Sequence, residues 1–267
     1  MKRPTRRTIS ILGATLLVAG LVRGADPKLS KAWQALSTGL YADAGSEFAR
    51  AAHTREARLG EAINLVNQPP VTPSSLDDAR DRLTALSAGD DETAHAARYF
   101  LGRLQQLHPN SPDPVAAAHE YEALVATNAD DTWCRLALIK LAILRLTVLA
   151  PPGDSAIRFT DTERLLTRTR DVLTLRDLHL VIAEARLNHR VYDEATLDHL
   201  RAALAITPAN DALRVDLLVQ IGRLASKLGD RETARTHYAQ FLKDYPKERR
   251  CYTVQSALDH LEGSFPP

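Results

Sequence analysis

Aromatic residues are scarce in this chain, at 5% of 267 residues, whereas alanine and leucine recur along its whole length. Runs of β-branched and aromatic residues between turn residues, which are typical of strands, are hard to find. This scarcity argues against a substantial β-sheet. Hydrophobic residues make up 45% of the chain and charged residues 25%, a balance that argues against extensive disorder. The composition therefore predicts an all-α protein.

Cysteine is equally sparse, because the chain has only Cys134 and Cys251 and no Cys-x-x-Cys pair. Cys134 follows Trp133 in a strongly apolar stretch, and we expect it to be a buried free thiol. Cys251 follows four charged residues at 247–250 and is expected to be more exposed. In an oxidising compartment the two could pair, so the sequence leaves a disulfide open while favouring free thiols.

Catalytic motifs are missing as well. The twelve glycines form no Gly-x-Ser-x-Gly elbow, no phosphate-binding loop and no dinucleotide-binding fingerprint. The nine histidines are scattered, and none belongs to a His-Glu-x-x-His motif. His119 and Glu122 are spaced for a weak metal site on one helix face, but a solvated polar face is the favoured interpretation. The sequence therefore predicts no enzyme, no cofactor and no metal site.

Two acidic clusters, Asp90-Asp91-Glu92 and Asp130-Asp131, each stand immediately before an expected helix. Carboxylates in that position accept hydrogen bonds from the free N–H groups of the first turn and complement the helix dipole. We interpret both clusters as helix caps and assign no chemistry to them.

The first 24 residues have the layout of a secretory signal: a basic head at residues 2–7, an apolar stretch at 9–22 and small residues before Ala25. The apolar stretch is short for a transmembrane helix, which needs about 20 apolar residues. We therefore expect a periplasmic or secreted protein. An uncleaved N-terminal anchor is the alternative, and membrane association is expected only in that case.

Cleavage would also change the charge. Residues 1–24 carry five basic groups and no acidic ones, so their removal takes the formal net charge from +1 to −4. A mildly acidic protein has no general electrostatic attraction to nucleic acid, and that class of partner is set aside.

A patterned stretch near the C-terminus describes two short antiparallel helices that meet through small residues. The pattern runs through Leu218, Ile221, Gly222, Ala225, Gly229, Ala234, Tyr238, Phe241 and Pro246. Small residues allow close helix approach, while the large neighbours fill the adjacent grooves.

The second half of this pattern recurs along the chain. Its anchoring alanines stand at positions 44, 79, 117, 195 and 234, separated by 35, 38, 78 and 39 residues. Because 78 is twice 39, we expect one degenerate unit between positions 117 and 195. Self-similarity at a nearly fixed period is typical of repeat folds.

With this pattern the chain resembles the tetratricopeptide-repeat family, whose unit is a 34-residue helix–turn–helix. The resemblance is closest over 215–248 and covers roughly 29–262. It implies a right-handed α-solenoid of about six hairpins with a capping helix, followed by a flexible tail at 263–267. The expected helices are 29–37, 41–53, 55–66, 74–87, 91–107, 112–127, 131–149, 160–173, 175–189, 192–206, 210–228, 231–244 and 247–262.

The resemblance also implies a function, because the first helices of such hairpins line a concave groove where peptides or partner helices bind. Repeat register places eight residues on this groove: Tyr99, Arg103, Gln106, Arg135, Asn188, Gln220, Arg223 and Lys227. Basic groups beside exposed aromatics suit an extended segment that carries acidic groups. We expect a non-catalytic scaffold of the cell envelope that binds a protein partner.

Two alternatives remain. An enzyme on a helical-repeat frame would need acidic or histidine side chains that converge in a closed pocket, and spatial dispersion of the nine histidines would rule it out. The other alternative is an accessory module that binds cell-wall polysaccharide or lipid. Solvent-facing aromatic clusters would favour it, and burial of Phe100 and Trp133 would count against it.

Overall fold

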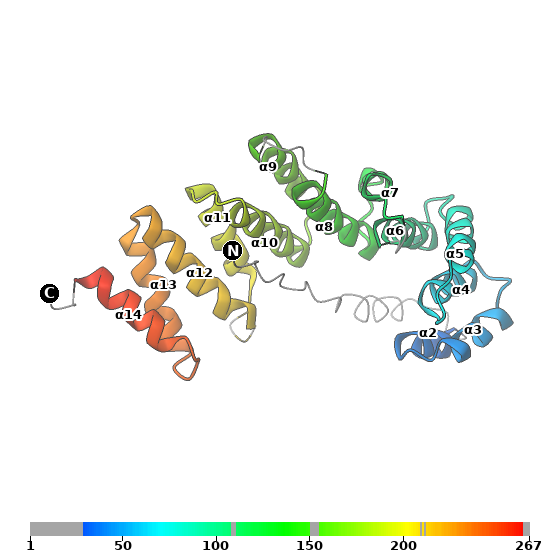
Figure 1. Ribbon diagram of the computed structural model, residues 1–267, viewed down its shortest axis with the longest axis horizontal. Helices are drawn as coiled ribbons and strands as arrows, with labels where there is room; N and C mark the ends of the chain where they lie inside the picture. Colours follow the sequence, from blue (N-terminus) through cyan, green and yellow to red (C-terminus); the bar gives the residue numbers. More distant parts are fainter. Residues whose placement is uncertain (1–28, 108–110, 150–154, 209, 211, 264–267) are drawn as a thin grey trace, which may run out of the picture. The chain divides into compact units, whose positions relative to one another are not determined.

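The structure is a computed structural model that describes residues 29–107, 111–149, 155–208, 210 and 212–263, with regular structure that is entirely helical in these ranges (Figure 1). The helices are α2 (Ser30–Ser37), α3 (Tyr41–Arg50), α4 (Arg55–Asn67), α5 (Pro73–Leu86), α6 (Glu92–Leu107), α7 (Pro114–Ala126), α8 (Thr132–Thr147), α9 (Ser155–Glu163), α10 (Val172–Asn188), α11 (Glu194–Ile206), α12 (Ala212–Leu228), α13 (Arg231–Asp244) and α14 (Cys251–Glu262), with a 3₁₀ segment, η1, at Arg164–Arg168. The predicted all-α class is confirmed. The expected signal at 1–24 lies outside the described residues, as does the tail beyond Gly263.

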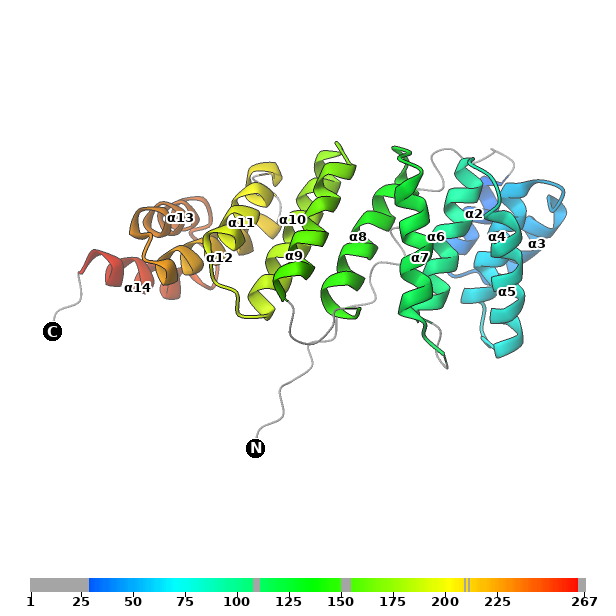
Figure 2. The same ribbon diagram turned by 90° about the horizontal axis from the view of Figure 1, so that it is seen from above.

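The chain divides into two compact units, one ending at Cys134 and the other beginning at Arg135. In the first unit, α2–α3, α4–α5 and α6–α7 pack as hairpins, and each hairpin also contacts the next. Figure 2 shows α4 to α7 side by side in this arrangement. In the second unit, α10–α11 and α12–α13 form hairpins of the same kind, and α14 packs on α13. Consecutive packing of helices is therefore the rule within each unit.

Glycines on the first helices allow the hairpins to close. A Cβ atom built on Gly222 would lie 2.4 Å from Cε1 of Tyr238, and one on Gly102 would lie 2.8 Å from Cε1 of Tyr121. In both cases the aromatic ring comes from the second helix of the same hairpin. The predicted small-residue contact is confirmed at these positions, because any side chain would overlap the ring.

Gly60 makes the same kind of contact in a different direction. A Cβ atom on it would lie 2.2 Å from Cε1 of Phe48, which belongs to α3 and hence to the preceding hairpin. The glycine of α4 therefore joins one hairpin to the one before it, whereas Gly222 closes a single hairpin.

The second-helix alanines at 44, 79, 117 and 234 are fully buried, as the pattern predicts. The prediction for Ala195 is wrong, because this residue is exposed and Thr196 is buried in its place. The Thr196 hydroxyl is held by two polar neighbours: it donates to Asp193 Oδ1 at 2.7 Å and accepts from Arg186 Nε at 3.0 Å. Because its hydroxyl is hydrogen-bonded, Thr196 can be buried where an alanine was expected. The buried position is therefore one residue later than the pattern predicts.

The degenerate unit lies where the spacing predicted it. A single helix was expected at 160–173, but the structure has α9 followed by the 3₁₀ segment η1, and both pack on α10. Asp171 ends this stretch by capping α10, since its Oδ1 accepts from Thr174 N at 2.8 Å. An aspartate that caps α10 cannot also lie inside the helix before it. The prediction that one helix continues to residue 173 is therefore wrong.

The apolar helix α8 is well buried in its central turns, as expected for an internal helix of a repeat array. Among the helices that the structure describes, none has the length and hydropathy needed to cross a membrane.

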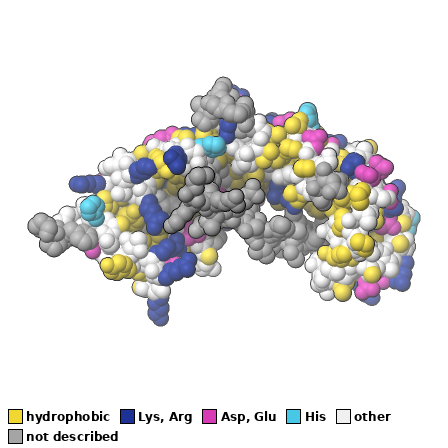
Figure 3. All heavy atoms as spheres, in the orientation of Figure 1, with side chains coloured by type: hydrophobic (Ala, Val, Ile, Leu, Met, Phe, Trp, Pro, Cys, Tyr) yellow, Lys and Arg dark blue, Asp and Glu magenta, His cyan; other side chains and the backbone are white. Residues whose placement is uncertain are grey.

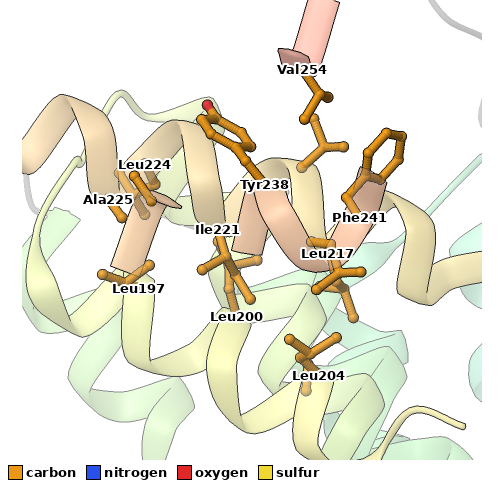
Figure 4. Close-up of a cluster of buried hydrophobic side chains, with 14 of the residues drawn as sticks. Leu197, Leu200, Leu204, Leu217, Ile221, Leu224, Ala225, Tyr238, Phe241 and Val254 are labelled. Atoms are coloured by element: carbon orange, nitrogen blue, oxygen red, sulfur yellow. The ribbon is translucent and has the colours of Figure 1, made fainter. Parts of the chain in front are cut away.

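The C-terminal core joins α10 to α14, and the side chains labelled in Figure 4 point into one shared space. Its labelled members are Leu197, Leu200 and Leu204 of α11, Leu217, Ile221, Leu224 and Ala225 of α12, Tyr238 and Phe241 of α13, and Val254 of α14. Helix α14 turns Val254 and Leu258 inward and leaves Tyr252 exposed, so it covers the last apolar face as a capping helix does.

The Gly222–Tyr238 contact predicts an unusual response to Gly222→Ala. In an open helix this change stabilises by up to about 1 kcal/mol through helix propensity. Here the added methyl would overlap a buried ring, so we expect a net loss of about 1–3 kcal/mol in the free energy of unfolding. Denaturant unfolding of the purified protein measures the effect.

The control is the same change in a Tyr238→Val background, which lacks the ring. There Gly222→Ala should be neutral or stabilising, giving a clear coupling energy in the double-mutant cycle. Equal effects in the two backgrounds would contradict the steric account.

Candidate interaction surface and polar clusters

Helix α12 has two different faces. One face is buried in the C-terminal core, while Gln220, Arg223 and Lys227 lie on the other, with Arg223 and Lys227 exposed and Gln220 half-buried. The three are spaced three and four residues apart, which places them on one side of a helix. We call this set the basic stripe. Figure 3 shows Lys and Arg side chains gathered over the C-terminal helices on the face in view.

The neighbouring turn between α10 and α11 contributes to the same region. Lys227 Nζ lies 3.0 Å from the centre of the Tyr192 ring, a cation–π contact. Tyr192 is 39% exposed and follows Asn188, the exposed last residue of α10, by four positions. Lys227 and the turn that follows Asn188 therefore lie in one neighbourhood. Sequence reasoning missed Tyr192, because it stands at the start of the helix expected at 192–206 and the groove residues were chosen from the first helices of the hairpins.

Arg135 lies elsewhere on the second unit. Its Nη1 is 3.6 Å from Oδ2 of Asp171, the residue that caps the start of α10. Asn188 is at the other end of that helix, whose 17 residues span about 25 Å. Arg135 is therefore not part of the neighbourhood formed by Asn188, Tyr192 and Lys227.

The three residues predicted in the first unit are less accessible than expected. Tyr99 is 0% exposed, so the expectation that it lines an open surface is wrong. It shares a helix face with His95 and Gly102, and that face is buried. Gln106 accepts a hydrogen bond from the hydroxyl of Tyr121 at 3.2 Å, and Arg103 is half-buried.

Tyr99 belongs to a buried aromatic cluster. Its ring centre lies 5.6 Å from those of Phe100 and Trp133 and 5.8 Å from that of Tyr121. Trp133 is almost completely buried and Phe100 is half-buried. These rings fill the space between α6, α7 and the start of α8 and stabilise the packing there.

A polar cluster surrounds His95 in the first unit. The imidazole is buried, with Nε2 3.0 Å from Asp90 Oδ1 and Nδ1 hydrogen-bonded to Asp131 Oδ2. Burial lowers the pKa of His95, but the hydrogen bonds and negative charges of Asp131 and Asp90 outweigh it, so the pKa lies above its ordinary value. The other oxygen of Asp131 accepts from Cys134 N at 2.8 Å.

The capping interpretation of the acidic clusters is therefore correct but incomplete. Asp91 and Asp131 do accept from first-turn N–H groups, Asp91 Oδ1 from Ala94 N at 2.7 Å. Asp90 and Asp131 additionally hold His95. The signal that could have revealed this is the separation of 36 residues between His95 and Asp131, one repeat, which places the two at neighbouring helix starts.

Cys134 completes the group. Burial raises the pKa of its thiol to about 11, so the protonated form is stable at neutral pH. Both cysteines are free thiols, as favoured, with Cys134 buried and Cys251 half-buried. His95, Asp131 and Cys134 each offer one metal-ligating atom, and these atoms lie within 4.8 Å of one another. Within the described ranges they form the only such group, and His119 and Glu122 belong to none.

A second polar cluster lies in the other unit, between α10 and α11. His179 Nδ1 and His199 Nδ1 are 2.8 Å apart, so one ring donates to the lone pair of the other. His199 Nε2 is 3.3 Å from Glu163 Oε1, and Arg186 donates to the same oxygen at 3.2 Å. His179 and His199 thus meet, and the prediction that the histidines are scattered is wrong for these two.

Both histidines of this pair have pKa values below the ordinary one. Burial lowers the pKa of His179, and the charge of His199 adds to the effect. Burial also lowers the pKa of His199 by more than its hydrogen bond and charge interaction with Glu163 raise it. The lowered pKa values favour the neutral form of both rings, and the shared hydrogen bond requires an unprotonated Nδ1 on at least one of them.

Comparison with known families agrees with the geometry of α12 and α13. Residues 216–248 match the family model described as tetratricopeptide repeat. This is the hairpin in which the sequence pattern was closest, and the resemblance is confirmed there. Among curated proteins, none matches the sequence.

The histidine pair predicts that stability falls in mild acid. Because the folded pKa values of His179 and His199 lie below the unfolded value of about 6.5, the unfolded chain binds more protons as the pH falls through that region. The contribution of this pair to the free energy of unfolding should therefore decrease below about pH 6.5. His95, whose pKa is raised, contributes with the opposite sign, so a comparison with a variant that lacks the pair isolates the effect. Glu163, Arg186 and Asp198 surround the pair.

Denaturant unfolding at pH 7.5 and 5.5 measures this dependence. The variant His179→Gln/His199→Gln should lose less stability than the wild type between the two pH values. His119→Gln, which changes an exposed histidine, should behave as the wild type does. An unchanged pH dependence in the double variant would contradict the assignment.

Proposed function

We propose that this chain, which carries a tetratricopeptide-type hairpin at 216–248 in series with similar hairpins, is a non-catalytic protein-interaction scaffold of the cell envelope. Tetratricopeptide repeats generally mediate protein–protein interaction. The observation that carries the proposal is the basic stripe on the first helix of the matched hairpin, where Arg223 and Lys227 are exposed and Gln220 is half-buried.

The chemistry of this surface favours a partner segment with acidic side chains or a carboxylate. Arg223 offers a planar guanidinium for paired hydrogen bonds to a carboxylate, and Lys227 offers a compact positive charge. Asn188 adds an amide that can donate to or accept from a peptide backbone. Tyr192 supplies a partly exposed ring against which an aliphatic side chain can pack.

The repeat register extends this surface over two first helices. Residues 181, 184 and 188 of α10 stand 39 positions before 220, 223 and 227 of α12, so equivalent positions occupy the same helix face. The Lys227–Tyr192 contact links the last of these positions on α12 to the turn that follows α10. On α10 these positions are Val181, Glu184 and Asn188. An extended acidic segment that crosses both helices would therefore pair with Arg223 and Lys227 on α12 and contact Asn188 on α10, with its acidic groups kept away from Glu184.

The polysaccharide-binding alternative is less well supported. It requires aromatic rings stacked towards solvent, whereas Tyr99 and Trp133 are buried and Phe100 is half-buried in the cluster that packs α6 against its neighbours. No observation on the described residues favours it over a protein partner.

The interaction proposal predicts that charge reversal on the stripe abolishes binding of acidic peptides. Peptides selected from a random library on the wild-type protein should be enriched in Asp and Glu. Their affinity, measured by fluorescence anisotropy, should fall at least about tenfold, or about 1.4 kcal/mol, for Arg223→Glu/Lys227→Glu. Binding should also weaken with added salt.

The matched control is Arg231→Glu/Lys243→Glu, which makes the same charge change at exposed positions of α13. Affinity in this variant should remain within about twofold of the wild type, as expected for a nonspecific charge effect. Equal losses in both variants, or selected peptides without acidic residues, would rule out a specific site at the stripe.

The envelope location rests on the N-terminal segment and predicts a processed protein. In the native host, the mature chain should begin at Ala25, and N-terminal mass spectrometry of the purified protein measures this. Fractionation then separates the outcomes. A cleaved protein should be recovered in the periplasmic or secreted fraction, whereas an intact N-terminus in the membrane fraction would support the anchor, and an intact protein in the cytosol would contradict export.

A further inference from the structure

We infer that His95, Asp131 and Cys134 form a binding site for a zinc-class divalent cation in the first unit. The inference concerns a buried cluster that the interaction surface does not use, and it stands independently of the proposed function. Its basis is the convergence of three different metal-ligating groups, imidazole, carboxylate and thiol, from two helix starts.

The repeat architecture brings these groups together. His95 lies in the first turn of α6, and Asp131 immediately precedes α8, one repeat further along the chain. Cys134 follows Asp131 by three residues, in the first turn of α8, so the two lie on the same side of that helix start. The backbone of two well-formed helices therefore holds all three residues.

The distances suit a small cation after a modest adjustment. The three ligand atoms lie within 4.8 Å of one another. Zinc bonds of about 2.0–2.3 Å in a tetrahedral arrangement hold neighbouring ligand atoms roughly 3.3–3.6 Å apart. Binding therefore requires His95 Nδ1 and Asp131 Oδ2 to separate and Cys134 Sγ to approach them, through rotation of the His95 ring and of the Cys134 side chain. The Sγ contacts with Thr127 Oγ1 at 3.4 Å and Leu124 O at 3.5 Å would be given up in this step. The hydrogen bond between His95 Nδ1 and Asp131 Oδ2 is replaced by the two bonds to the ion.

Two of the three ligands are oriented by a neighbour through an atom that the ion does not need. Asp90 Oδ1 accepts from His95 Nε2 at 3.0 Å, which leaves Nδ1 for the ion. Asp131 Oδ1 accepts from Cys134 N at 2.8 Å, which leaves Oδ2. In zinc sites a ligating histidine usually donates its other ring N–H to a carboxylate, and a ligating carboxylate is itself hydrogen-bonded.

The ligand types select the class of metal. Thiolate and imidazole favour Zn²⁺ over Mg²⁺ and Ca²⁺, which prefer oxygen. Three protein ligands leave a fourth position for water. Binding requires the thiolate and a free Nδ1 lone pair, so the ion displaces the thiol proton and the Nδ1 proton, and both pass to solvent. The bound ion would tie the start of α6 to the start of α8.

Cobalt(II) titration of the reduced, full-length protein tests the site, because a thiolate–cobalt bond gives a charge-transfer band in the near ultraviolet. We expect one equivalent to bind with this band, and one equivalent of Zn²⁺ to displace it. Cys134→Ser should abolish the band, and His95→Gln should weaken binding by at least about tenfold. Cys251→Ser, which removes the other thiol, should leave the titration unchanged.

A second measurement guards against misfolded variants. Zn²⁺ should raise the thermal midpoint of the wild type and of Cys251→Ser, since a ligand that binds only the folded state stabilises it, and it should leave Cys134→Ser unchanged. Absence of the charge-transfer band in the folded wild type would overturn the proposal. So would equal bands in Cys134→Ser and the wild type, because binding would then depend on other residues.

Discussion

The close approach of two helices across a single glycine underlies most of the arrangement seen in this chain. At Gly102 and Gly222 the aromatic ring of the partner helix occupies the volume that a Cβ atom would need. Such a contact tolerates little added side-chain volume, because protein interiors are packed as densely as crystals of small organic molecules. It fixes which face of the first helix turns inward. On α12 the inward face carries Gly222 and Ala225, and the basic stripe is therefore left on the outside.

Where the small-residue contact is absent or displaced, buried polar groups replace it. Thr196 occupies the expected alanine position and holds Arg186, whose guanidinium also reaches Asp193 at 2.8 Å and lies over the Phe159 ring. Buried polar atoms need partners, and a set of mutually bonded residues meets that need more readily than one residue alone. The cluster around Arg186 consequently marks the irregular part of the array beside α9, whereas the His95 cluster lies beside the regular α6–α7 hairpin.

Regular features of the fold could be predicted because they depend on local pattern. The α12–α13 hairpin combines a small-residue contact, a Gly-Asp turn and an aromatic, and α14 follows with one apolar side. The burial of Tyr99 could not be predicted in this way, because it depends on where α7 and the start of α8 lie relative to α6. The one-residue shift at Ala195 depends on hydrogen bonds to Thr196 that no apolar pattern records.

Several polar contacts between hairpins nevertheless follow the repeat period. Arg55 with Asp91, His95 with Asp131, and Glu163 with His199 are all 36 residues apart. Asp216 and Arg250 are 34 apart. Equivalent points on stacked hairpins are neighbours in space, so residues one period apart meet even when each looks isolated in its own helix. A search for sites in a repeat chain should therefore compare positions across a period as well as within a helix turn. By that comparison His95 and Asp131 form a pair, and Cys134, three residues beyond Asp131, extends it to three ligands.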